Sequence, residues 1–228
     1  LGYSEEKPWY FDIIEACIAA KIPLSIGDGA PDEKLLYGIE SLNHHKAKGA
    51  VFLKPYSDEK LLERIDWAGD VAEIFGIDID SYAIVTMRNQ VKLEKKSATQ
   101  LRFLKDECRS RANVPFAIKG IFSEEDVALV REVRPDIVVV SNNGGRVPAR
   151  QGSTVAFLAE MGTELARYCG EVWVDGGVRQ PQDLVTARRL GASTVLIGRP
   201  FATALMKGGK SEVFVRAAQL RGTSEDLD

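Results

Sequence analysis

Two short stretches near the end of the chain decide the fold. Residues 171–179 read Glu-Val-Trp-Val-Asp-Gly-Gly-Val-Arg, and residues 191–201 read Gly-Ala-Ser-Thr-Val-Leu-Ile-Gly-Arg-Pro-Phe. Each holds an apolar run, Val172–Val174 or Thr194–Ile197, that ends at glycine and arginine. The polar segment between them predicts a helix that begins after Gln180, with Pro181 in the first turn, where a missing N–H costs nothing. Strand, glycine turn, helix, strand and glycine turn form the repeat of a parallel βα sheet.

The two glycine turns predict a phosphate site. In βα-barrels the loops after the last two strands commonly bind phosphate through backbone N–H groups. Gly176, Gly177 and Gly198 allow an anion to approach the backbone closely, and Arg179 and Arg199 can neutralise it. The alternative is a pair of tight turns with solvated arginines. Two consecutive turns, one βα unit apart, favour the phosphate site.

The same repeat extends over the whole chain. Seven runs predict strands: Leu24–Ile26, Ala50–Leu53, Ala72–Ile77, Phe116–Ile118, Ile137–Val140, Val172–Val174 and Thr194–Ile197. Helical patterns alternate with them: Trp9–Ala20, Asp32–Lys46, Asp58–Trp67, Thr99–Arg109, Glu124–Val133, Thr154–Tyr168, Pro181–Leu190, Ala202–Met206 and Ser211–Leu220, before a polar tail at 223–228. We therefore expect one domain over residues 1–228, an α/β (βα)8 TIM barrel. Eight strands close a barrel and this chain opens on a helix, so the first strand is expected to lie outside the sequence.

Composition narrows the class of protein. At 228 residues the chain suits one barrel, and its net charge of −3 gives no basic field for nucleic acid. Three dispersed cysteines, Cys17, Cys108 and Cys169, are typical of free thiols in a reducing compartment. No apolar run approaches the roughly 20 residues of a membrane span. We expect a cytoplasmic protein without a membrane segment, a nucleic-acid partner or a metal site.

Polar residues that follow the predicted strands are candidates for the site. Lys119 directly follows the run that ends at Ile118, so its ammonium should point into the barrel mouth; the alternative is a rim lysine paired with a carboxylate. Ser141-Asn142-Asn143-Gly144-Gly145-Arg146 follows the next strand and offers hydroxyl and amide groups, and an arginine able to bind a carboxylate bidentately. Asp175 ends the strand after that, or simply holds the Gly176-Gly177 turn.

Four motifs in register resemble those of the FMN-dependent α-hydroxy acid oxidases and dehydrogenases. They are Ile118-Lys119-Gly120, Val140-Ser141-Asn142-x-Gly144-Gly145-Arg146, Asp175-Gly176-Gly177-Val178-Arg179 and Ile197-Gly198-Arg199-Pro200. The resemblance is good over about residues 115–205 and weaker over 9–80, where strand order agrees but few motif residues do. It implies an eight-stranded barrel, bound FMN, a small carboxylate substrate and a homo-oligomer, tetrameric or larger.

The resemblance also implies a role for each motif residue. Lys119 is similar to the lysine at the flavin N1/O2 edge, where a cation stabilises the anionic reduced flavin. Asp175, Gly176, Gly177 and Arg179 resemble ribityl and phosphate contacts, Gly198 and Arg199 the second phosphate turn, and Ser141 a further cofactor contact. Arg146 resembles the arginine that holds the substrate carboxylate.

One departure from the family pattern bears on the chemistry. Asn143 stands where the family has the catalytic histidine, and an amide cannot act as a general base near neutral pH. The two histidines, His44 and His45, are predicted near a helix end at the opposite rim, exposed to solvent. Asp80 resembles an aspartate that orients the missing histidine, and Tyr56 is a loose match to a family tyrosine. Any activity then needs another base, for which Asp78, Asp80 and Tyr56 are the candidates, or a substrate that needs none.

The sequence leaves three functions open. The leading one is an FMN-dependent oxidoreductase of the 2-hydroxy acid type for which the usual base mechanism is in doubt. The second is a barrel similar to IMP dehydrogenase, although its catalytic cysteine would lie in a loop after a strand, where this chain has none. The third is a catalytically silent flavin- or phosphate-binding barrel.

Overall fold

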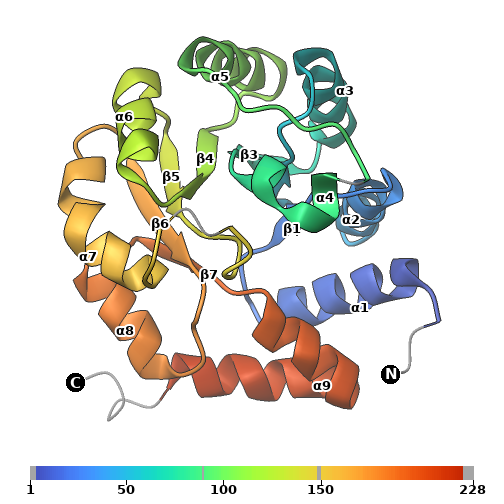
Figure 1. The fold of residues 1–228 in the computed structure, drawn as a ribbon. Helices are drawn as coiled ribbons and strands as arrows, with labels where there is room; N and C mark the ends of the chain where they lie inside the picture. The colour runs from blue at the N-terminus through green and yellow to red at the C-terminus, as the bar shows by residue number, and fades with distance from the viewer. Residues whose placement is uncertain (1–3, 89, 148–149, 223–228) are drawn as a thin grey trace.

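A computed structural model describes residues 4–88, 90–147 and 150–222. Within these ranges the chain forms a parallel seven-stranded sheet in the order β1-β2-β3-β4-β5-β6-β7, curled and surrounded by helices (Figure 1). The strands are β1 (Ser25–Gly27), β2 (Gly49–Leu53), β3 (Ala72–Asp78), β4 (Phe116–Ile121), β5 (Ile137–Val140), β6 (Glu171–Asp175) and β7 (Thr194–Leu196). All seven predicted strands are confirmed, with limits that differ from the prediction by at most three residues. The predicted tail at 223–228 lies outside the described residues.

The helices also follow the prediction, with differences in two places. They are α1 (Glu6–Ala19), α2 (Glu33–His44), α3 (Asp58–Ala68), α4 (Val85–Arg88), α5 (Ala98–Ala112), α6 (Glu124–Val133), α7 (Thr154–Leu165), α8 (Pro181–Arg189) and α9 (Arg199–Arg221), with a 3₁₀ turn η1 (Ser81–Ala83). The turn η1 and the short α4 fall outside all of the predicted helices. The two helices predicted at the end form the single element α9, which is interrupted by non-helical backbone at Gly208 and Gly209. No helix of the described ranges has the length and apolar character needed to cross a bilayer.

The sheet is open between its first and last strands. Within the described residues β1 pairs only with β2, and β7 pairs only with β6. The described residues therefore form no closed eight-stranded barrel, and the side of β1 where a first strand was expected has no partner among them. Helices α1 and α9 pack against each other, and Figure 1 shows them side by side below this opening.

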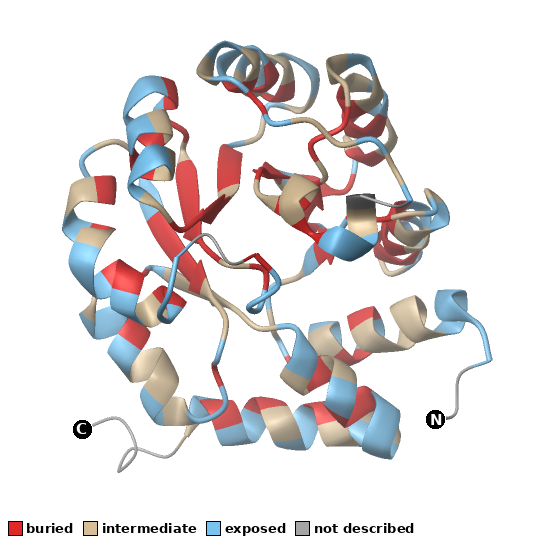
Figure 2. Ribbon diagram, in the orientation of Figure 1, coloured by how far each residue is buried: buried red, intermediate tan, exposed pale blue. Residues whose placement is uncertain are grey.

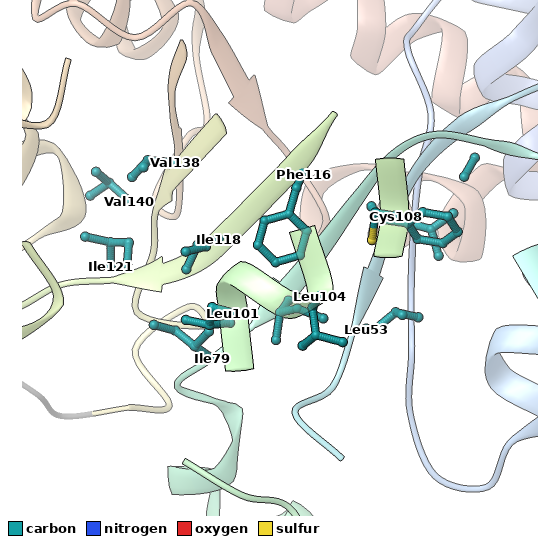
Figure 3. Packing of buried hydrophobic residues seen from close by; sticks show 14 of the residues in the cluster. Leu53, Ile79, Leu101, Leu104, Cys108, Phe116, Ile118, Ile121, Val138 and Val140 are labelled. Atoms are coloured by element: carbon teal, nitrogen blue, oxygen red, sulfur yellow. The ribbon is translucent and has the colours of Figure 1, made fainter. Parts of the chain in front are cut away.

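Most of the core lies between the sheet and the helices around it. Along the strands, residues that face the helices alternate with residues that face the inside of the curl. Figure 2 shows the buried residues concentrated on the strands and on the inner faces of the helices. Figure 3 shows Phe116, Ile118 and Ile121 of β4 in one cluster with Val138 and Val140 of β5. A second, smaller cluster fills the inside of the curl around Phe52, Val139 and Trp173. The run Ile137–Val140 is buried throughout, as expected of a parallel strand covered on both faces.

A bulge in β4 places the residues at its end. The register with β5 shifts between Lys119 and Ile121, and Gly120 adopts a φ of 99°, which an L-amino acid rarely takes. A Cβ atom added at Gly120 would lie 2.4 Å from Oδ1 of Asp80. Position 120 therefore requires glycine both for its backbone conformation and for its close contact with Asp80, just beyond β3.

A buried ion pair fixes the ends of β1 and β2 to α3. The Arg64 side chain is completely buried, and its Nε donates to Oδ2 of Asp28 at 2.8 Å. The guanidinium stacks on the ring of Tyr56, whose hydroxyl donates to the Gly29 carbonyl. Tyr56 is thereby held away from the barrel mouth, beside a separate pocket of about 300 Å³. This position removes Tyr56 from the candidates for an active-site base.

Candidate functional site

The carboxyl ends of four neighbouring strands bring a cluster of charged groups together. Lys119 Nζ donates to Oδ1 of Asp78 at 3.0 Å and to Oγ of Ser141 at 2.9 Å. It also lies 3.3 Å from Oδ2 of Asp175. The Ser141 hydroxyl in turn donates to that same Asp175 oxygen at 2.8 Å. Both interpretations of Lys119, a group that points into the barrel mouth and a rim lysine paired with a carboxylate, thus hold in part. Its ammonium lies at the mouth and is paired with carboxylates.

A second lysine belongs to the same cluster. Lys54, just after β2, places Nζ 2.5 Å from Oδ2 of Asp78, so each oxygen of that carboxylate faces one ammonium. Sequence reasoning missed Lys54 as a site residue. The signal was present, because Lys54 directly follows a strand just as Lys119 follows the predicted run that ends at Ile118.

Asn143 is buried at the centre of this cluster and has a left-handed backbone with a φ of 53°. Its Nδ2 donates to Oδ1 of Asp78 at 3.1 Å and to Oδ1 of Asp80 at 2.6 Å. Its Oδ1 accepts from Lys119 at 3.3 Å. Both amide hydrogens are therefore used within the protein, and Asn143 acts as a cross-brace between the lysine and two carboxylates.

The surroundings shift the pKa values of Asp78 and Asp80 in opposite directions. Burial would raise the pKa of Asp78, but the ammonium groups of Lys119 and Lys54 hold it well below its usual range. Burial, followed by the charge of Asp78, raises the pKa of Asp80 to about 7. Burial would lower the pKa of Lys119, yet the carboxylates of Asp78 and Asp175 hold it above its usual range. Lys119 is thus a permanent cation, and Asp78 is too acidic to accept a proton readily.

The two glycine turns form the opposite wall of the site. Gly176 and Gly177 have φ values of 94° and 79°, and a Cβ added at Gly177 or Gly198 would meet no atom within 4 Å. Gly198 caps the first turn of α9, whose free N–H groups favour an anion. The backbone N–H of Arg179 donates to Asp183 at the start of α8, the helix start predicted from Pro181.

Among the described residues, the side chains of the exposed arginines at this site donate to backbone carbonyls. Arg179 donates to the carbonyl of Val178, Arg199 to that of Gly144 at 3.3 Å, and Arg146 to that of Asn143 at 2.9 Å. None of these bonds is to a carboxylate, so each guanidinium keeps its full charge toward the cavity.

One cavity of about 1260 Å³ connects the lysine cluster with the glycine turns. Nine of the ten site residues expected from the sequence line it: Lys119, Asn143, Arg146, Asp175, Gly176, Gly177, Arg179, Gly198 and Arg199. Ser141 lies behind the wall and bonds to Lys119 and Asp175. The cavity also extends between β1 and β7 toward α1 and α9, where Ile13 and Leu220 line it.

The histidines lie far from this mouth, at the end of α2. His44 is exposed, as expected, but His45 is half-buried and its Nε2 has no hydrogen-bond partner among the described residues. Both rings lie against Phe11 of α1, and this packing accounts for the burial that the sequence did not predict. Neither histidine is available as a base at the mouth.

The fold and the site define a βα-barrel protein whose rim carries two glycine–arginine turns and a lysine facing one cavity. The family model for FMN-dependent dehydrogenases matches residues 58–222, and the chain belongs to that family. This match favours the leading function over the alternative similar to IMP dehydrogenase.

Individual relatives are similar over about half of the chain. The 4-hydroxymandelate oxidase of Amycolatopsis orientalis is 37% identical over 105 residues, which cover 46% of this chain and 29% of the relative. The cytochrome-type L-lactate dehydrogenase of Saccharomyces cerevisiae is 37% identical over 112 residues, which cover 47% of this chain and 19% of the relative. The matched segments thus cover less than a third of the length of these relatives. A crystal structure of a mandelate oxidase variant superimposes with a TM-score of 0.71 at 23% identity, over 96% of this chain and 68% of that one, and shows the shared fold.

FMN is the cofactor of this family, and the residues present fit it. The part of the cavity at the barrel mouth is lined by the cations and glycine turns that a flavin nucleotide requires. Oδ1 of Asp175 is buried without a partner among the described residues, which suits it to accept a hydrogen bond from a ligand hydroxyl. Arg179 and Arg199 would hold the phosphate, and Lys119 the polar edge of the ring.

Proposed function

We propose that this protein binds FMN across the barrel mouth and acts as an oxidoreductase on small 2-hydroxy carboxylates, with turnover limited at residue 143. The observation that carries this proposal is the single cavity bordered by Lys119, Arg179 and Arg199. These cations supply the charges that a flavin ring edge and a phosphate require. When bound, FMN supplies the acceptor for the two electrons that leave the substrate.

The chain's own residues divide the remaining tasks. Arg146 is exposed to the cavity and binds the substrate carboxylate, for which a guanidinium offers a bidentate pair of donors. Lys119 keeps its proton and maintains a positive charge at the ring edge. Asn143 has no proton acceptor of useful basicity, so the step that removes a proton from the substrate is slow.

The test has two stages. FMN is first titrated with the purified full-length protein while its fluorescence is recorded, and quenching that saturates at one FMN per chain is expected. The complex is then mixed anaerobically with glycolate, lactate or mandelate, and bleaching of the flavin absorbance gives the rate. Absence of FMN binding would refute the proposal.

A second candidate function is a flavin-binding barrel without turnover. It is supported by the state of Asn143 and Lys119, because every donor of the amide and of the ammonium is used inside the protein. Tight FMN binding with no bleaching by any 2-hydroxy acid would select this second candidate.

The organisation of the protein is part of the same proposal. We treat residues 1–228 as one cytoplasmic domain that assembles into a homo-oligomer of four or more chains. Free cysteines support a reducing compartment, and the exposed Phe214 and Val215 of α9 support an apolar contact between chains. Light scattering of the full-length protein would give the assembly size, and a monomer would contradict this part.

A further inference from the structure

Asp80 lies one residue behind the wall of the cavity. Asp78 and Asn143 line the cavity, and Asp80 lies behind them, where it accepts from the Asn143 amide at 2.6 Å and neighbours the Asp78 carboxylate. Its other oxygen, Oδ2, is buried and has no partner among the described residues. A buried oxygen without a donor is far costlier as part of a carboxylate than as part of a neutral carboxyl group.

The charges around Asp80 are balanced without it. Asp78 faces it from β3, Lys119 from β4 and Lys54 from the end of β2, while Asp175 of β6 faces Lys119. Two ammonium groups therefore meet two carboxylates. Ionised Asp80 would add a third carboxylate to these two ammonium groups, whereas protonated Asp80 leaves their charges balanced.

We propose that Asp80 is a positioning residue that carries the proton of the Asp78–Asp80 pair and thereby controls how strongly Lys119 attracts an anionic ligand in the cavity. The identity of the ligand rests on the proposed function, whereas the assignment of the proton to Asp80 is independent of it. This role of Asp80 also gives Asn143 a defined task, since its amide group donates to both carboxyl groups and accepts from Lys119.

The consequence is that anion affinity falls as Asp80 ionises. The new negative charge partly cancels the field of Lys119 at the cavity. For unit charges several ångströms apart in a medium of intermediate dielectric constant, a change on the order of tenfold in affinity is expected. Burial and Asp78 raise the pKa of Asp80 to about 7, so this change falls between about pH 6 and 8.

The ligand test measures the dissociation constant of FMN by fluorescence quenching from pH 5.5 to 8.5. The FMN phosphate, with a second pKa near 6 like other phosphate monoesters, gains charge with pH and strengthens binding to arginines, so its effect has the opposite sign. The unaltered protein should bind FMN about tenfold more weakly above pH 8 than near pH 6.5. Asp80→Asn should lose this decline and keep only the phosphate effect.

A second readout needs no ligand. Infrared difference spectra of the unaltered protein should show a protonated carboxyl band that disappears with a midpoint near pH 7. Labelling the aspartates of the unaltered protein with ¹³C should shift this band, so the band can be assigned to aspartate even if Asp80→Asn does not fold. Asp126→Asn is the matched control, because burial also raises the pKa of Asp126 but its carboxyl lies on α6 and accepts from Phe122 and Ser123.

The outcomes separate the two proposals. A band that titrates near pH 7 in the unaltered protein and in Asp126→Asn, but is missing from Asp80→Asn, supports the inference. Absence of that band from the unaltered protein overturns it, as does the same pH profile of FMN affinity in the unaltered protein and in Asp80→Asn. Failure to bind FMN at any pH refutes the proposed function, and with it the proposal that Asp80 controls FMN affinity. The infrared titration then decides by itself whether Asp80 carries the proton.

Discussion

Replacing Asn143 by histidine should create the proton acceptor that the barrel mouth lacks. The Asn143 amide already donates to Asp80 at 2.6 Å, so an imidazole N–H can keep this partner while its second nitrogen provides a base. A placed base contributes about 10²–10⁴-fold, or roughly 3–5 kcal/mol of activation free energy. Losing the amide bonds to Asp78 and Lys119 costs about 1–3 kcal/mol. We therefore expect oxidation of a 2-hydroxy acid to be about 10- to 1,000-fold faster in Asn143→His.

The assay is anaerobic bleaching of the FMN complex by glycolate or lactate in a stopped-flow instrument, with Asn143→Gln as the control that retains an amide. The rate of Asn143→His should rise with pH as the imidazole loses its proton, and ionised Asp80 should move that transition to higher pH. The reasoning is refuted if the unaltered protein already turns over at a typical rate of about 10 s⁻¹. It is also refuted if Asn143→His binds FMN normally yet is no faster than Asn143→Gln.

Three further predictions follow from the same contacts. Arg199→Ala should weaken FMN binding by roughly 1.5–3 kcal/mol, measured by fluorescence titration, because it removes a charged hydrogen bond; an unchanged affinity would exclude Arg199 from the phosphate site. Gly120→Ala should lower the free energy of unfolding by about 2–4 kcal/mol in urea, since φ is 99° and the new Cβ meets Asp80 at 2.4 Å; a loss below about 0.5 kcal/mol would contradict the strain. Arg64→Met should cost about 3–5 kcal/mol by leaving Asp28 buried without its cation, and the loss should shrink when Asp28→Asn is added.

The elements could be predicted because local signals and burial agree. Ile137–Val140 is an uninterrupted β-branched run, and the Gln180–Pro181 pair marks the start of α8. Turn η1 and helix α4 could not be predicted, since they are shorter than one hydrophobic repeat. The residues 208 and 209 look like a helix boundary in sequence, but packing continues α9 on both sides of them.

The candidate site was predictable as a set of positions but not as a network. Strand ends and glycine turns locate Lys119, Asp175 and the two arginine turns, since parallel strands bring their carboxyl ends to one edge. The local sequence does not show that Asn143 donates both amide hydrogens to aspartates, or that Lys54 and Lys119 both pair with Asp78. These contacts join residues between 24 and 65 positions apart in the chain, so only the folded sheet defines them.

The bulge at Gly120 sets the phase of β4. Before it, residues alternate strictly, so Ala117 faces the inside of the curl and Ile118 the outer core. The extra residue breaks the alternation after Lys119, so Ile121, three positions beyond Ile118, returns to the outer core opposite Val140. A regular strand of the same sequence with Lys119 inward would place Gly120 in the outer core and Ile121 inside the curl. The bulge absorbs the glycine, and for this reason one strand can present the lysine to the cavity and the isoleucine to the core.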